Sequence, residues 1–169
     1  MKKSKIIFVV GGIFSGIGKG IVISSIGNFF KRRGAKIGII KLDPYLNIDA
    51  GRLSPSEHGE VFVTKDGQET DLDLGNYERF LGQDMNKNSF KTLGNVLYKV
   101  LEKEKNFEYK GKTIDFKDVR DEVYQEIIAF EARYSPDLLL VEIGGKISDF
   151  NIRPFMEAGQ KLRNERGKK

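Results

Sequence analysis

The chain has 169 residues, a formal net charge of +5 and no cysteine. This length suits one compact domain with its own core. The absence of cysteine excludes disulfides, thiolate zinc sites and a cysteine nucleophile within these residues. No apolar run reaches the ~18 residues that a membrane-spanning helix needs, so we expect no membrane partner. The absence of cysteine fits a cytoplasmic location, which we expect.

The chain begins with a pattern typical of a βαβ unit. A basic start and a short apolar run resemble a secretion signal, but no small-residue cleavage site follows. We therefore interpret residues 6–10 as a buried parallel strand that ends in the glycine-rich loop of residues 11–20. Residues 19–34 have helical periodicity and end at a glycine, and residues 36–42 form a second apolar strand.

The remaining segments continue the alternation of strands and helices. Two further strands are expected. Residues 59–70 contain a short strand that enters a turn at Asp66-Gly67. Residues 136–145 contain the most apolar strand of the chain. Three helices are expected at residues 89–105, 118–134 and 153–166. This order predicts an α/β domain with a mainly parallel sheet flanked by helices. Ligands of such sheets bind at the carboxyl ends of strands, where Gly11-Gly12 and Gly144-Gly145 lie.

The loop GGIFSGIGKG nearly fits the phosphate-binding pattern G-x-x-x-x-G-K-[ST]. It differs at Ile13, where the pattern has glycine, and at Gly20, where it has serine or threonine. Glycines let the backbone approach a phosphate closely, and a lysine at the start of the helix adds a cation. Gly16, Gly18 and Lys19 therefore favour a nucleotide site, and the alternative is a plain strand-to-helix turn.

Acidic residues are available to replace the missing hydroxyl as ligands of Mg²⁺. Glu69, Asp71 and Asp73 alternate, so in an extended loop they would project to one side. Glu142 lies inside an apolar strand, where a carboxylate is costly unless it is paired or bound to metal. Because Mg²⁺ usually takes one or two carboxylates plus phosphate oxygens, Asp73 and Glu142 are the candidate ligands. The alternative is a solvated acidic loop and a salt-bridged glutamate.

Three other features bear on function. Lys41 ends the second strand and so faces the edge where ligands bind. His58 is the only histidine, and a lone histidine in a loop is more often structural than catalytic. The basic tail KLRNERGKK is typical of solvated surface, and since no aromatic residues interleave with it we do not expect nucleic-acid binding.

Four segments together resemble the N-terminal synthetase (amidoligase) domain of the CTP synthase family. They are GGIFSGIGKG, KLDPYLNIDAG, SPSEHGEVFVTKDGQETDLDLGNYERF and LLVEIGGKISDFNIRPFMEA, and the resemblance runs from about residue 6 to residue 158. It implies a Rossmann-like P-loop fold and the ATP-dependent amination of UTP to CTP. In that reaction ATP phosphorylates the uracil 4-oxygen and ammonia then displaces the phosphate.

The resemblance also implies a role for each matching residue. Ser15 would contact the pyrimidine nucleotide, and the loop residues would hold the ATP phosphates: Gly16, Ile17, Gly18, Lys19, Gly20 and Ile21. Lys19 and Lys41 would be catalytic, stabilising charge during phosphoryl transfer. Asp73 and Glu142 would hold Mg²⁺. Asp149, Phe150 and Asn151 occupy the segment where the family reads CTP.

The sequence also departs from the family. DFKDVRD stands where the family has QVIPHIT, and Lys146 and Asn151 stand where it prefers Thr and Glu. Residues 1–169 are expected to form a single domain that is incomplete relative to the family, with no glutaminase domain. The alternative to an active amidoligase is a catalytically deficient nucleotide-binding or regulatory relative. Family members form tetramers, so we expect a homo-oligomer or association with a full-length synthase.

Overall fold

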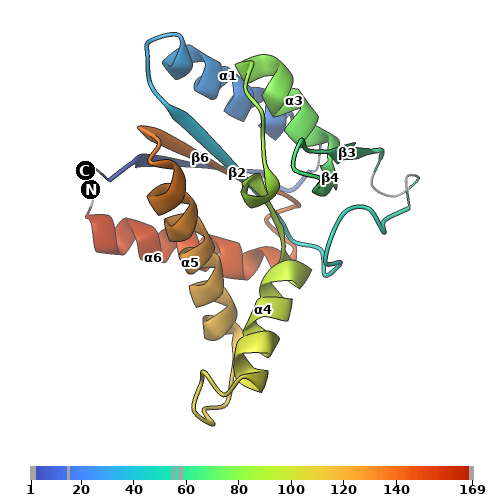
Figure 1. Ribbon diagram of the computed structural model, residues 1–169, viewed down its shortest axis with the longest axis vertical. Helices are drawn as coiled ribbons and strands as arrows, with labels where there is room; N and C mark the ends of the chain where they lie inside the picture. Colours follow the sequence, from blue (N-terminus) through green and yellow to red (C-terminus); the bar gives the residue numbers. More distant parts are fainter. Residues whose placement is uncertain (1–2, 15, 55, 57–58, 168–169) are drawn as a thin grey trace.

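The computed structural model describes residues 3–14, 16–54, 56 and 59–167. Its main sheet has four parallel strands in the order β1-β6-β2-β5: Lys5–Val10, Leu138–Ile143, Ile37–Asp43 and Phe90–Thr92. The predicted α/β fold with a mainly parallel sheet is confirmed, and Figure 1 shows helices on both faces of that sheet.

The described helices cover both faces of the sheet (Figure 1). The first face carries α1, Lys19–Lys31, and α3, Leu72–Leu81. The second carries α4, α5 and α6: Leu93–Lys105, Phe116–Tyr134 and Arg153–Arg166. The helix predicted for residues 153–166 is confirmed at both ends.

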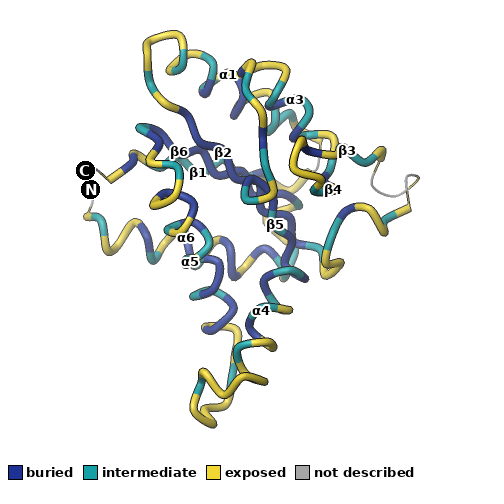
Figure 2. The backbone as a smooth tube through the Cα atoms, viewed as in Figure 1, coloured by how far each residue is buried: buried dark blue, intermediate teal, exposed yellow. Residues whose placement is uncertain are grey.

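Burial on both faces explains why the central strands are continuous apolar runs. Successive side chains of a strand point to opposite faces. Accordingly Ile39 and Leu140 join the core beneath α1 and α3, whereas Ile40 and Val141 join the core beneath α4, α5 and α6. Figure 2 shows the sheet as the most buried part of the chain, with exposed backbone at the far end of α4.

A small antiparallel hairpin lies beside α3. Its strands are β3, Val61–Val63, and β4, Glu69–Asp71. The turn predicted at Asp66-Gly67 is present, and Gly67 has the positive φ of 85° that favours glycine there.

The prediction for two segments was wrong. Residues 89–92 were predicted as the start of a helix, but Phe90–Thr92 form β5, because they pair with β2 and Phe90 is buried. The 3₁₀ turn Lys87–Ser89 precedes β5, and the Thr92 side chain caps α4 by accepting from Asn95 N at 2.9 Å.

The acidic stretch is also not one extended loop. Asp71 ends β4 and its side chain accepts from Asp73 N at 3.0 Å, which begins α3. Asp73 therefore lies in the first turn of a helix that the sequence patterns did not predict.

Candidate functional site

The glycine-rich loop connects β1 to α1 at the carboxyl end of the sheet. Gly16 and Gly18 have φ values of 71° and 85°, a left-handed conformation that glycine adopts at little cost. Gly18 is the N-cap residue of α1, so the free amides of the helix start face the loop. This arrangement of backbone amides suits an anion. Ser15, expected to contact the pyrimidine nucleotide, and His58 lie outside the described residues.

Lys19 reaches back across the ends of β1 and β6. Its Nζ donates to Gly145 O at 3.4 Å, and a Cβ built at Gly11 would lie 3.0 Å from the same Nζ. Ile147 N donates to Gly12 O at 3.1 Å, which joins the segments that follow the two strands. Both glycine pairs thus lie together at the strand ends, and they leave room for the lysine.

The Lys41 side chain is buried among four carboxylates. Its Nζ forms a salt bridge with Asp73 and lies 2.7 Å from Asp71 Oδ2. Asp43 Oδ1 and Glu142 Oε1 lie at 3.9 Å and 4.0 Å. Lys41 and Glu142 are register partners on the neighbouring strands β2 and β6, so the sheet itself fixes their approach.

The electrostatics of this cluster are unbalanced, because one ammonium faces four acidic groups. Burial lowers the pKa of Lys41, but the carboxylates outweigh it and hold that pKa well above its ordinary value. Burial raises the pKa of Asp43 well above its usual range despite Lys41, and Asp71 raises it further. Burial likewise raises the pKa of Glu142, although Lys41 and Tyr77 oppose the shift. A further cation would relieve this excess of negative charge.

The neighbours of Gly20 explain why a glycine, and not a serine or threonine, follows Lys19. A Cβ built at Gly20 would lie 3.2 Å from Asp73 Oδ1 and 3.8 Å from Tyr77 Cε1. The Asp73 carboxylate therefore occupies the space into which a side chain after Lys19 would project. In this fold α3 places a carboxylate oxygen where a standard phosphate loop has the hydroxyl of its own serine or threonine.

Two residues of the cluster were not identified from the sequence as site residues, Asp43 and Tyr77. Asp43 is buried, and its Oδ2 has no hydrogen-bond partner among the described residues. Tyr77 is fully buried, and its hydroxyl donates to Glu142 Oε2 at 2.5 Å. The available signals were the place of Asp43 directly after the strand and the four-residue spacing of Asp73 and Tyr77 on one helix face.

A cavity of about 430 Å³ joins the loop to these acidic residues. The cavity is lined by residues of the loop, α1, α3 and β6: Gly16, Ile17, Gly18, Lys19, Gly20, Ile21, Asp73, Asn76, Phe80 and Glu142. No group of three or more acidic or histidine side chains among the described residues forms a complete metal cage. Two carboxylates beside a phosphate loop are nevertheless the donor set that Mg²⁺ takes when phosphate oxygens and water complete its shell.

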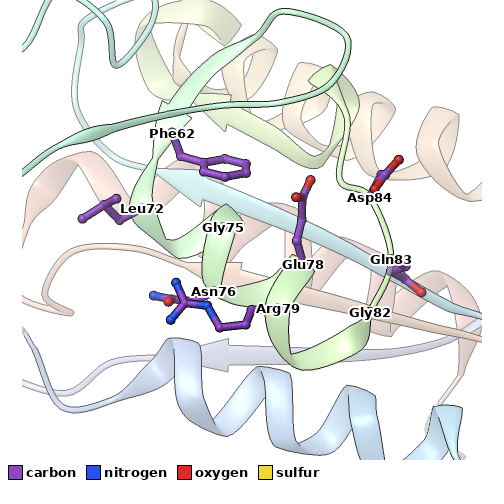
Figure 3. Close-up of a pocket in the computed structure, with 9 residues that line it drawn as sticks. All are labelled: Phe62, Leu72, Gly75, Asn76, Glu78, Arg79, Gly82, Gln83 and Asp84. Atoms are coloured by element: carbon purple, nitrogen blue, oxygen red, sulfur yellow. The ribbon is translucent and has the colours of Figure 1, made fainter.

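A neighbouring hollow of about 600 Å³ lies along α3 and the hairpin. Figure 3 shows its lining, which has apolar and charged side chains but no residue of the glycine loop: Phe62, Leu72, Gly75, Asn76, Glu78, Arg79, Gly82, Gln83 and Asp84. Asn76 lines both hollows.

The segment expected to read CTP lies apart from the lining of the 430 Å³ cavity. Asp149 caps a 3₁₀ turn, Phe150–Ile152, by accepting from Asn151 N at 2.9 Å. Phe150 is exposed and packs edge-on against Phe116, with ring centroids 5.4 Å apart. The structure thus brings together the loop, Lys41, Asp73 and Glu142, but not residues 149–151.

Across the described part of the chain, no helix combines the length and apolar character needed to cross a membrane.

Comparison with known proteins gives a consistent result. The family described as CTP synthase N-terminus matches residues 5–169. The chain is 49% identical over 166 residues to the CTP synthase of Phytoplasma australiense, covering 98% of this chain and 30% of that protein. It is 48% identical over 166 residues to that of Onion yellows phytoplasma (strain OY-M), again covering 98% of this chain and 31% of the relative.

A third relative matches almost as well. The CTP synthase of Pyrobaculum aerophilum is 47% identical over 164 residues, which cover 96% of this chain and 31% of that protein. The chain spans about a third of the length of these relatives. On the match over residues 5–169 and these identities, the chain belongs to the CTP synthase N-terminus family.

Proposed function

We propose that the chain binds Mg·ATP and serves the ATP-dependent amination of UTP to CTP. The observation that carries this proposal is the meeting of Lys19 with the Asp73 and Glu142 carboxylates at one cavity beside a glycine-rich helix start. Family membership supports the same function, because each of the relatives described above is named CTP synthase.

Each group of site residues has a separate role in the proposed phosphoryl transfer. The amides at the start of α1 bind phosphate oxygens, and the Lys19 ammonium neutralises charge that develops on the transferred group. Lys41, which is held by the Asp71 and Asp73 carboxylates, would place a second ammonium beside the transferred group. Asp73 and Glu142 would hold Mg²⁺, which when bound supplies further charge neutralisation at the phosphates.

The pyrimidine nucleotide would lie toward the segment of Asp149, Phe150 and Asn151. Phe150 offers an exposed aromatic ring there. Binding of UTP or CTP, self-association and association with a full-length synthase are parts of this proposal. A relative that binds nucleotide without catalysing the reaction is the competing outcome.

Titration calorimetry with ATP, with and without Mg²⁺, tests the binding step. Lys19→Ala should weaken ATP binding by ~1–3 kcal/mol, the cost of losing a hydrogen bond to a charged group. Lys65→Ala is the matched control, because Lys65 is exposed and forms its salt bridge with Asp84 at the surface. Equal affinities for all three proteins would contradict the phosphate-loop assignment.

An assay of CTP formation from UTP, ATP and ammonia then separates the two outcomes. CTP production by a protein that binds Mg·ATP supports the amidoligase, and binding without turnover supports the catalytically deficient relative.

A further inference from the structure

Tyr77 contacts Glu142 at the centre of the site, and we propose that it is a positioning residue for that carboxylate. The inference rests on the proposed binding of Mg²⁺ by Asp73 and Glu142. Tyr77 comes from α3 and Glu142 from β6, and both side chains are almost wholly buried. The Tyr77 hydroxyl donates to Glu142 Oε2 at 2.5 Å.

This hydrogen bond fixes the orientation of the carboxylate. Oε2 is held by Tyr77, and Oε1 lies 4.0 Å from Lys41 Nζ, toward the other acidic groups. Without the hydroxyl, Glu142 would be free to turn both oxygens to Lys41. Donors of this kind beside a metal ligand set its orientation, and their loss typically lowers metal affinity ~10–100-fold.

The same helix face delivers both a ligand and its support. Asp73 and Tyr77 are four residues apart on α3, so their side chains lie one turn apart on one face. That face contacts α1 at Gly20, where the absence of a Cβ leaves space for the Asp73 carboxylate and the Tyr77 ring. A ring needed only for packing would not require a hydroxyl directed at the one carboxylate of β6.

The test compares Tyr77→Phe with a matched control, Tyr134→Phe. Tyr134 also uses its hydroxyl within the fold, accepting from Asn88 Nδ2 at 2.8 Å and donating to Asn86 Oδ1 at 3.0 Å, but it lies in α5 on the other face of the sheet. Electron paramagnetic resonance would measure Mn²⁺ affinity with a non-hydrolysable ATP analogue present. We expect Tyr77→Phe to weaken Mn²⁺ binding ~10-fold or more and Tyr134→Phe to leave it unchanged.

A second comparison guards against a purely structural effect. In the Glu142→Gln background, adding Tyr77→Phe should cause no further loss of Mn²⁺ affinity, because the tyrosine acts through the carboxylate. A further loss there, or wild-type Mn²⁺ affinity in Tyr77→Phe itself, overturns the positioning role and leaves Mg·ATP binding standing. Failure of the wild-type chain to bind Mn²⁺ with the nucleotide would instead overturn the proposed function, and this inference with it.

Discussion

The Asp43 carboxylate lies in unfavourable electrostatic surroundings. It is buried, Oδ2 has no hydrogen-bond partner among the described residues, and Asp71 lies nearby. Burial is the main reason that its pKa in the folded protein is raised well above its usual range. A carboxylate at this place therefore costs stability at neutral pH, which is tolerated where it serves a bound cation.

The substitution Asp43→Asn should raise the melting temperature of the ligand-free protein at pH 8. The folded state of the wild type binds the Asp43 proton more tightly than the unfolded state does. Its stability therefore falls as pH rises from about 4, the ordinary pKa of aspartate, through the raised pKa. Each ~1 kcal/mol moves the melting temperature ~2–4 °C in a domain of this size.

Thermal melts across a pH series measure this difference. The gap between variant and wild type should shrink as pH falls toward about 4 and close below it, where Asp43 is protonated in both states. Asp84→Asn is the control, because the Asp84 side chain is 65% exposed, and it should follow the wild type. A variant that melts below the wild type at pH 8 would show that the Asp43 charge stabilises the fold.

At the scale of elements, the contact between α1 and α3 sets the geometry of the site. Gly20→Ala would place a Cβ 3.2 Å from Asp73 Oδ1. Alanine favours a helix over glycine by ~1 kcal/mol, which offsets the crowding, so we expect little change in melting temperature. Displacement of the Asp73 carboxylate should still weaken Mg²⁺-dependent ATP binding by ~1–1.5 kcal/mol.

Titration calorimetry of Mg·ATP binding and thermal melts, each on Gly20→Ala and on Ser25→Ala, check that affinity falls while stability does not. Ser25 is exposed on the same helix, so its substitution should change neither quantity. Unaltered Mg·ATP affinity in Gly20→Ala would mean that Asp73 does not need the space beside α1.

The elements that the sequence predicted correctly are those with strong periodicity or long apolar runs. β2 and β6 are buried on both faces, so their sequences are unmistakably apolar. β5 and α3 were missed for a physical reason: each depends on partners that no local pattern reveals. β5 has three residues whose strand conformation comes from pairing with β2. α3 begins at the capping residue Asp71, which in the sequence belongs to an alternating pattern of acidic residues typical of extended backbone.

The sequence indicated those candidate site residues whose type is unusual for their local sequence. Glu142 stands out as a carboxylate in an apolar strand, and Lys19 as a lysine after glycines. The sequence could not indicate that Lys41 is enclosed by acidic groups, since Asp43, Asp71 and Asp73 reach it only through tertiary packing. Tyr77 reads as an ordinary core residue, and only the structure shows its hydroxyl on Glu142.

At the scale of the whole molecule, Arg166 joins the two ends of the described chain. Its guanidinium contacts Glu131 of α5 and donates to Ser4 O at 3.2 Å, while Ser4 N donates to Glu131 Oε1 at 2.6 Å. The start of β1, the end of α5 and the end of α6 thus share one ion-pair network.

Arg166→Met should therefore destabilise the protein by ~1–3 kcal/mol, because the largely buried Glu131 charge loses its counter-ion. Urea denaturation measures this change. Arg163→Met is the control on the exposed side of the same helix. If both variants unfold at the same urea concentration as the wild type, the network contributes nothing to stability.

The four central site residues come from four separate segments: Lys19 after β1, Lys41 in β2, Asp73 in α3 and Glu142 in β6. No fragment of the chain carries the site, so ligand affinity and tertiary order are thermodynamically linked. α3 is anchored to the rest of the fold through Leu74, Tyr77 and Leu81. A local opening that releases only α3 would dismantle the ligand set while the sheet stays intact. Under the proposed function, bound nucleotide would therefore suppress that opening and make the position of α3 more rigid.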